Sequence, residues 1–129
     1  MEQKTIKKIG VLTSGGDAPG MNAAIRAVVR TALYHNVSVI GIRKGYNGLI
    51  NGEIKEMYSK DVSNVMNLGG TILHTARCPE MMTEEGQNKA AAIYKILGLD
   101  ALVGFVILAR VGIEVPVVLH LVIPAGLPG

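Results

Sequence analysis

At 129 residues the chain is long enough for one domain with a hydrophobic core and too short for two ordinary domains, which excludes a tandem-domain protein. Hydrophobic residues make up 49% of the chain and charged residues 18%, so intrinsic disorder is excluded as its main state. The formal net charge of +3 favours anionic small partners and does not indicate nucleic acid.

The cysteine content and the apolar runs indicate the compartment. The only cysteine, Cys78, excludes an intramolecular disulfide and a multi-cysteine metal site, and it favours a reducing environment. Residues 1–8 are polar and charged, without the apolar core of a secretory leader. Charged residues and a proline interrupt the apolar residues of 102–108 and 115–123 before the roughly twenty needed for a membrane span accumulate. We therefore predict a cytoplasmic protein, with no membrane partner, in which both runs are buried strands.

The first elements in chain order form a β-α-β unit. Residues 8–12 are apolar and β-rich, and they enter a loop of small residues and turn formers over 13–20. Apolar side chains then recur at helical spacing over 21–34, with Pro19 near the first turn. A strand over 37–42 completes the unit, whose two strands we expect to be parallel and joined by a right-handed crossover.

The later elements alternate in the same way. Residues 45–48 are predicted to form a turn, 60–67 a short helix and 84–97 a longer helix that stops at Gly98. The unbroken apolar character of 100–108 predicts a buried parallel strand. The expected fold class is therefore α/β, with a doubly wound, mostly parallel sheet and helices on both of its faces.

A glycine-rich loop marks the expected binding site. Ligands of such a sheet bind at the carboxyl ends of the strands, where the loop 13–20 must lie. Gly15, Gly16 and Gly20 let the backbone approach a phosphate closely, and the N–H groups that open the next helix favour an anion. The same glycines also suit a tight strand-to-helix turn without a ligand, because their spacing is neither the Walker pattern nor the dinucleotide fingerprint.

Residues 9–26, with the sequence IGVLTSGGDAPGMNAAIR, resemble the opening of bacterial 6-phosphofructokinase. The stretches 41–48, 69–73 and 75–87 agree with that family in order and spacing, so the resemblance covers about 7–103. It implies transfer of the γ-phosphoryl of ATP to the 1-hydroxyl of fructose 6-phosphate, with Mg²⁺, as a step of glycolysis. It also implies a homotetramer under allosteric control by a nucleoside diphosphate (ADP) and phosphoenolpyruvate.

The resemblance also implies residues that contact ATP. Gly16 would bind the phosphates through its backbone N–H, and Arg77 and Cys78 would lie at the nucleotide. Arg77 would be close to the transferring phosphoryl group, where a fixed planar guanidinium stabilises developing charge. Without the resemblance, Arg77 would be interpreted as a surface charge and Cys78 as a small buried hydrophobe. Tyr46 would pack near the adenine side, or serve only as a packing residue.

Two arginines on the first predicted helix suggest a second anion site. Arg26 and Arg30 are four positions apart, so they share a helix face and repel each other unless an anion or acid lies between them. The resemblance implies a diphosphate effector there, at a subunit interface, whereas the residues alone would equally suit a solvated face. Ser59 occupies a position where family members often have a basic or different residue, which leaves effector control open. The expected effector residues are Arg26, Ala27, Val28, Val29, Arg30, Ser59, Lys60, Asp61, Val62, Ser63 and Asn64.

The resemblance breaks off after Val103. Where the family has the glycine-aspartate loop that holds nucleotide and magnesium, this chain has the apolar sequence of 104–110, so we expect no metal ligand in the chain. Residues 126–129 again resemble the family, just before the segment that carries its aspartate base. Residues 104–123 are a divergent sequence, a reading error in part of the gene, or a sign that the chain is a fragment of a longer protein.

These differences define what we expect of the chain by itself. Residues 1–129 would be a partial nucleotide-binding domain, the sugar-binding domain would not be present in this chain, and the chain alone would be inactive. One alternative is a non-catalytic nucleotide- or phosphate-binding module. Another is a pyrophosphate-dependent relative, although residues 17–22 look more like the ATP-using branch.

Overall fold

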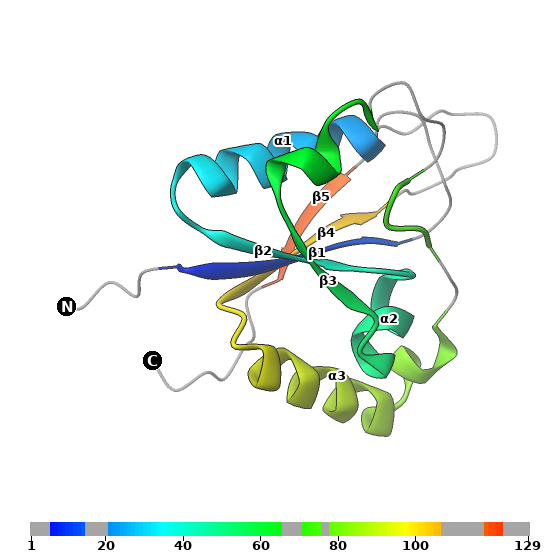
Figure 1. Cartoon of the computed structure of the whole chain (residues 1–129). Coiled ribbons are helices and arrows are strands. Elements are labelled where there is room, and N and C mark those ends of the chain that lie inside the picture. Colours follow the sequence, from blue (N-terminus) through cyan, green and yellow to red (C-terminus); the bar gives the residue numbers. More distant parts are fainter. Residues whose placement is uncertain (1–5, 15–20, 66–70, 76–77, 107–117, 123–129) are drawn as a thin grey trace, which may run out of the picture.

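A five-stranded sheet in the order β3-β2-β1-β4-β5 runs through the middle of the computed structural model, with helices above and below it (Figure 1). The structure describes residues 6–14, 21–65, 71–75, 78–106 and 118–122. Its elements are β1 (Lys8–Ser14), α1 (Met21–Tyr34), β2 (Ser38–Ile42), α2 (Gly45–Asn51), β3 (Ile54–Met57), the 3-10 turns η1 (Ser59–Val62) and η3 (Pro79–Met82), α3 (Glu84–Leu97), β4 (Ala101–Val106) and β5 (Val118–Val122).

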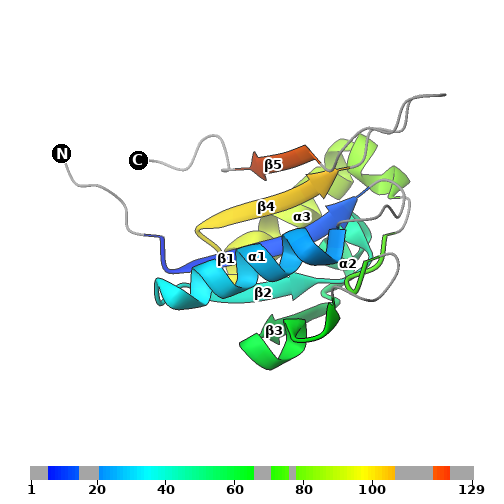
Figure 2. The ribbon, with the colours of Figure 1, turned by 90° about the horizontal axis from the view of Figure 1, so that it is seen from above.

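The three central strands are parallel, and an antiparallel strand lies at each edge. In β1, Ile9 pairs with Val39 of β2 on one side and with Ala101 of β4 on the other. β3 and β5 run antiparallel to β2 and β4, and the view from above shows all five strands in order (Figure 2). The predicted parallel pairing of the first two strands is confirmed, and so is the doubly wound α/β class.

Successive side chains of the sheet are buried in two different cores, because strand side chains alternate between faces. Val11 belongs to the core beneath α1 and η1, whereas Leu12 belongs to the core that α2 and α3 cover. Figure 1 shows α1 on one side of the sheet and α2 and α3 on the other, so both faces are covered as predicted.

The two long helices begin and end near the positions that the sequence predicts. α1 covers the expected 21–34. At the start of α3, Thr83 Oγ1 accepts a hydrogen bond from the Gly86 N–H at 3.0 Å, which satisfies one of the free donors of a helix N-terminus. Gly98 ends α3 in the left-handed conformation, with a φ of 70°. The predicted helix over 84–97 and its glycine stop are confirmed.

The predicted turn over 45–48 is wrong, because Gly45–Asn51 forms the helix α2. Lys44 before it and Gly52 after it both have left-handed backbone conformations, and Gly45 at its first position also has a positive φ of 60°. Gly48 is required for close packing, since a Cβ there would overlap the carbonyl oxygen of Arg43. Glycines that mark close backbone approach look the same in sequence as glycines that mark a turn.

The predicted short helix over 60–67 is also different in the structure. The 3-10 turn η1, Ser59–Val62, forms at the start of this range, and 66–67 lie outside the described residues. Ser63 Oγ donates to the Lys60 carbonyl at 2.8 Å and Asn64 has a φ of 62°, so both residues favour a turn over a continuing helix.

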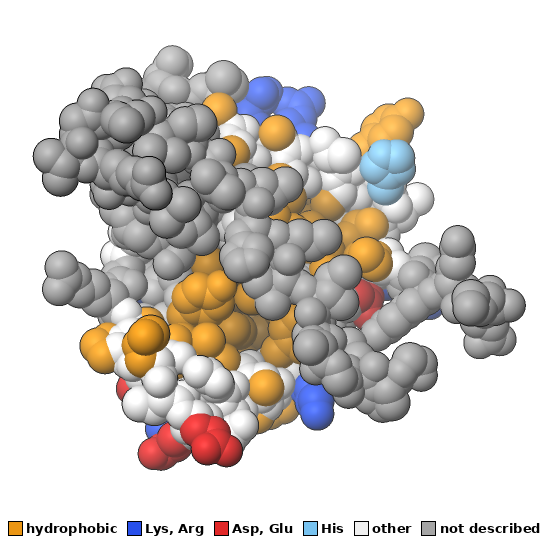
Figure 3. Space-filling model, turned by 180° about the vertical axis from the view of Figure 1, so that it is seen from behind, with side chains coloured by type: hydrophobic (Ala, Val, Ile, Leu, Met, Phe, Trp, Pro, Cys, Tyr) orange, Lys and Arg blue, Asp and Glu red, His pale blue; other side chains and the backbone are white. Residues whose placement is uncertain are grey.

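The late apolar runs form strands. β4 lies within the predicted 100–108 and pairs in parallel with β1, and β5 lies within 115–123 at the outer edge of the sheet. In the parts of the chain that the structure describes, no helix has the length and apolar character that a membrane crossing needs. Seen from behind, apolar side chains are visible across the middle of the molecule and acidic ones at its lower end (Figure 3). Apolar surface of this kind is typical of places where further protein packs.

Candidate functional site

The carboxyl ends of the parallel strands define one edge of the sheet. Ser14 at the end of β1 pairs with Val106 at the end of β4, so both strands end together. The glycine-rich loop connects this end of β1 to Met21, the first residue of α1. Its expected phosphate-binding residue, Gly16, lies outside the described residues. The topology therefore places both ends of the loop at the edge where such sheets bind ligands.

A second segment, 71–75, is attached to this edge by hydrogen bonds. The Lys44 N–H, just after β2, donates to the Leu73 carbonyl at 2.8 Å. Thr13, near the end of β1, donates its hydroxyl to the His74 carbonyl at 3.1 Å and lies 3.1 Å from the hydroxyl of Thr71. The segment thus joins the ends of two neighbouring parallel strands.

The first turn of α1 holds the same segment from the other end of the loop. Asn22 Oδ1 accepts a hydrogen bond from the Ile72 N–H at 2.7 Å, and Asn22 is buried. Thr71 Oγ1 accepts from the Leu73 N–H at 3.2 Å. Sequence reasoning did not assign a role to Thr13, Asn22 or Thr71. Their signals in the sequence are that they are polar residues flanking glycine-rich stretches and that they lie within the stretches that resemble the family.

The segment leads directly to the expected nucleotide residues. Cys78 is half-buried and precedes η3, whose first residue is Pro79. Arg77 lies outside the described residues, between Thr75 and Cys78, which the structure does describe. The candidate site therefore consists of the two ends of the glycine-rich loop, the bonded segment and Cys78.

Tyr46 lies on α2, half-buried against the core that α2 and α3 cover. Burial raises the pKa of its hydroxyl above the ordinary value, because the charged form is disfavoured there. This placement is that of a packing residue, and the suggested position near adenine remains a prediction.

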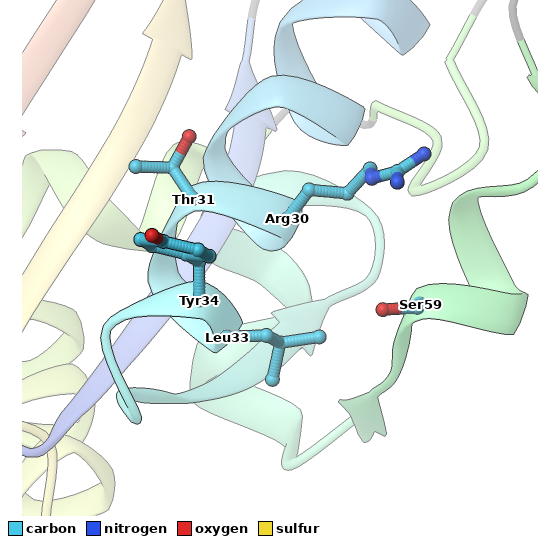
Figure 4. A pocket seen from close by; sticks show the side chains of 5 residues that line it. All are labelled: Arg30, Thr31, Leu33, Tyr34 and Ser59. Carbon is cyan, nitrogen blue, oxygen red and sulfur yellow. The ribbon is translucent and has the colours of Figure 1, made fainter.

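A second candidate site lies between α1 and η1. An open pocket of about 520 Å³ is lined by Arg30, Thr31, Leu33, Tyr34 and Ser59. Figure 4 shows Arg30 and Leu33 extending from α1 on the side where Ser59 lies. The structure thus brings together the two stretches, 26–30 and 59–64, that the sequence assigns to an effector.

The other expected effector residues are arranged differently around this pocket. Arg26 is half-buried, and the side chains of Val29 and Val62 lie in the core and do not face the pocket. Among the described residues that line the pocket, Arg30 is the one with a charged side chain. Ala27, Lys60, Ser63 and Asn64 are exposed, while Val28 and Asp61 are half-buried.

Asp61 is already engaged within η1. Its carboxylate accepts a hydrogen bond from the Tyr58 N–H at 2.8 Å and pairs with the Lys55 ammonium at 3.0 Å. The Tyr58 hydrogen bond and the Lys55 charge hold the pKa of Asp61 below its ordinary value. The positive charge of Lys55 is thereby balanced by the carboxylate of Asp61, which stays ionised.

Magnesium ligands do not come together in the described part of the chain. No group of three His, Cys, Asp or Glu residues there is placed to hold a metal ion. Mg²⁺ prefers carboxylate oxygens, and the described carboxylates are not gathered into such a group.

A mostly parallel α/β sheet with a glycine-rich strand-to-helix loop at its carboxyl edge is typical of nucleotide- and phosphate-binding domains. The family model of phosphofructokinase matches residues 8–105. This match covers more than half of the chain, and the chain belongs to the phosphofructokinase family.

Relatives from two clostridia support this assignment. Over 98 residues the chain is 63% identical to an ATP-dependent 6-phosphofructokinase of Clostridium botulinum and 60% identical to one of Clostridium acetobutylicum. Each match covers 76% of this chain and 31% of the relative. The chain therefore spans about a third of the length of the relatives that it matches.

Solved structures agree with the fold. The phosphofructokinase of Pichia pastoris in the T-state matches 80% of this chain and 11% of its own, with a TM-score of 0.74 and 43% identity. That of Saccharomyces cerevisiae matches 76% of this chain and 13% of its own, with a TM-score of 0.73 and 46% identity. A pyrophosphate-dependent phosphofructokinase of Marinobacter aquaeolei has a TM-score of 0.67 at 17% identity, which shows a common fold alone.

Proposed function

We propose that this chain is the nucleotide-binding part of an ATP-dependent 6-phosphofructokinase. The single observation that carries the proposal is the 63% identity to such an enzyme over 98 residues. The family model matches 8–105, a range that includes the glycine-rich loop and residues 71–78. The hydrogen bonds that join the segment 71–75 to both ends of that loop support it, because they connect described residues that flank the two proposed ATP-contacting parts in the sequence. The assignment of residues 1–129 as a partial nucleotide-binding domain is part of this proposal.

In this proposal the chain binds ATP by positioning and electrostatics. Backbone N–H groups of the loop that contains Gly16 bind the phosphates, and the N-terminus of α1 adds its positive dipole. Arg77 places a guanidinium near the γ-phosphoryl group, and Cys78 lies beside the nucleotide. Phosphoryl transfer depends mainly on such positioned charges, so each of these groups acts by stabilising charge on the phosphoryl oxygens.

The substrates and partners of the whole enzyme follow from the same relatives. The reaction would transfer the γ-phosphoryl of ATP to fructose 6-phosphate, with Mg²⁺, in a cytoplasmic homotetramer. The aspartate base is not among the residues of this chain that the resemblance identifies. We therefore expect the 129-residue chain to bind ATP and to release no ADP when fructose 6-phosphate and Mg²⁺ are added.

Titration calorimetry with ATP tests this function. Replacing Arg77 with Ala is expected to weaken ATP binding about tenfold, since a charge-assisted contact to phosphate is lost. Lys95→Ala is the matched control, because Lys95 is an exposed cation in the last turn of α3. No ATP binding at millimolar concentration, or equal weakening in both variants, would contradict the proposal.

The pocket between α1 and η1 supports a second part of the proposal, an effector site for ADP. Arg30 supplies a cation and Ser59 a hydroxyl on facing elements, which suits a phosphate group. Phosphoenolpyruvate, the other expected effector, presents the same anionic chemistry. Competition between ADP and phosphoenolpyruvate in the same titration tests whether the two share this pocket.

A further inference from the structure

Thr13 connects β1 to the segment 71–75 through a buried chain of hydroxyl groups. Its side chain is 0% exposed, and its hydroxyl has one proton, which is donated to the His74 carbonyl. The hydroxyl of Thr71, 3.1 Å away, is therefore the donor in the bond between the two threonines. Thr71 Oγ1 also accepts from the Leu73 N–H. Both threonine hydroxyls therefore have partners. Thr13 accepts from Thr71 and donates to the His74 carbonyl, so this pair of hydrogen bonds depends on the Thr13 hydroxyl.

Asn22 fixes the same segment through a different element. Its carboxamide oxygen accepts the Ile72 N–H at 2.7 Å, and the side chain is 3% exposed. Thr13 precedes the glycine-rich loop and Asn22 follows it. The two residues therefore bind the segment 71–75 to both ends of the loop that is proposed to hold the phosphates.

The segment does not adopt this shape through its local sequence alone. His74 has a φ of 60°, a left-handed conformation that a residue with a side chain rarely adopts, and its side chain is exposed. Such a conformation persists where surrounding bonds determine it. The hydrogen bond from Thr13 to the His74 carbonyl is one of those bonds, three positions before Arg77 and four before Cys78.

We infer that Thr13 and Asn22 are positioning residues for the proposed nucleotide site, which fix the segment 71–75, shortly before Arg77 and Cys78 in the sequence, to the two ends of the glycine-rich loop. This inference rests on the proposed function. Neither residue needs to contact ATP. Their side chains act on the site through the backbone of residues 72 and 74.

Two pairs of variants separate positioning from simple packing. Thr13→Val keeps the shape of the side chain and removes its hydroxyl, whereas Thr13→Ser keeps the hydroxyl and removes a methyl group. Asn22→Leu removes the acceptor, and Asn22→Asp keeps an oxygen in its place. If packing alone matters, Ser is the more damaging replacement at residue 13. If positioning matters, Val is.

Cys78 provides a reporter that needs no ligand, because it is the only cysteine of the chain and half-buried. The rate of its modification by the disulfide reagent DTNB measures how often the segment opens. Thr13→Val and Asn22→Leu are expected to raise this rate about three- to tenfold, and Thr13→Ser and Asn22→Asp less than twofold. The rates are measured in folded protein, with circular dichroism as the check. If Thr13→Val does not fold, the inference is tested by comparing the Cys78 modification rates of Asn22→Leu and Asn22→Asp. Rates equal to wild type in Val and Leu variants would overturn the inference.

Adding ATP distinguishes this inference from the proposed function. ATP is expected to slow Cys78 modification in wild type and to bind about tenfold more weakly to Thr13→Val, with binding restored in Thr13→Ser. If ATP slows Cys78 modification in neither wild type nor the variants, the proposed function fails, even when Thr13→Val and Asn22→Leu raise the rate of modification. If ATP protects wild type and Thr13→Val at the same concentration, ATP binding stands and the positioning role fails.

Discussion

The carboxylate of Asp100 accepts a hydrogen bond from the backbone N–H of Lys7 at 2.8 Å, 93 positions away in the sequence. The same oxygen accepts from the Lys8 N–H at 3.1 Å, and the Asp100 N–H donates to the Lys8 carbonyl at 2.8 Å. Asp100 directly precedes β4 and Lys8 begins β1. This contact fixes the register of the central pair of strands at the edge opposite the candidate functional site.

Removing that carboxylate should destabilise the sheet without touching the site. Asp100→Ala is expected to lower the free energy of unfolding by about 1–2 kcal/mol, because two backbone donors lose their acceptor. Asp100→Asn keeps an acceptor oxygen and should lose less than half as much. Urea titration measures the free energy of unfolding of both variants, and the slope of that free energy against urea concentration should be the same as in wild type. An Ala variant within a few tenths of a kcal/mol of wild type would contradict this role.

The sequence predicts the parallel core well because its signals are local. The short β-rich run of β1 and the helical spacing of α1 and α3 depend on neighbouring residues, and the structure confirms these elements. β3 was not predicted, since its two central residues, Lys55 and Glu56, are exposed and give no alternation. It forms because β2 offers an unpaired edge, which no pattern within Ile54–Met57 records.

The candidate site, too, could be predicted from the sequence only in part. Its place at the carboxyl edge follows from the strand-loop-helix order and a general rule of such sheets. The bond between Thr13 and Thr71 could not be predicted, because 58 positions separate them and threonine has no preferred long-range partner. The pairing of α1 with η1 around the pocket likewise depends on tertiary packing of Val29 and Val62.

His74 offers a test of backbone strain next to the site. Its φ of 60° is tolerated by His, Asn and Asp but strongly disfavours β-branched residues. His74→Val is therefore expected to cost about 1–2 kcal/mol of stability, although the side chain is exposed and loses no packing. His74→Gly is the matched control and should be nearly neutral, since its greater freedom in the unfolded chain offsets the relief of strain. Thermal unfolding followed by circular dichroism compares them, and a Val variant as stable as the Gly variant would refute the strain.

The pocket between α1 and η1 predicts a gain of binding as well as a loss. Arg30→Ala should weaken ADP binding about tenfold, because the charged side chain that lines the described part of the pocket is lost. Ser59→Arg should strengthen it by a similar factor, since a second cation then faces the pocket from η1. Calorimetry with ADP measures both, and Lys95→Ala is the control. A Ser59→Arg variant that binds ADP no better than wild type would count against an anion site here.

The stability contributed by Asp61 should depend on pH in one direction. Its pKa is lowered by the Tyr58 N–H and by Lys55, so folding favours the charged carboxylate. The contribution is complete above the ordinary pKa of 3.8 and is lost as the pH falls through the lower value of the folded state. Relative to Asp61→Asn, wild type should be more stable at pH 6 by less than about 1 kcal/mol, and this difference should vanish at low pH. Urea titrations of both proteins between these pH values test the sign, and a difference that grows on acidification would contradict it.

Gly86 connects the stability of α3 to the candidate functional site. A Cβ at residue 86 would overlap the carbonyl oxygen of Glu80 in η3. That carbonyl is held in place, because it accepts from the Thr83 N–H at 3.0 Å and from the Thr83 hydroxyl at 2.6 Å. Alanine normally stabilises a helix by about 1 kcal/mol relative to glycine, but here the clash forces η3 away from the helix.

Gly86→Ala is therefore expected to destabilise the protein by about 1–3 kcal/mol, against the usual helix propensity. Asn88→Ala, at an exposed position of the same helix, should be slightly stabilising and serves as control. Because η3 begins directly after Cys78, the displacement should also raise the rate of Cys78 modification in Gly86→Ala and leave it unchanged in Asn88→Ala. A Gly86→Ala variant that melts at a higher temperature than wild type would show that η3 does not pack against α3 as described. A destabilised variant with an unchanged Cys78 rate would show that η3 moves independently of the segment that leads to Arg77.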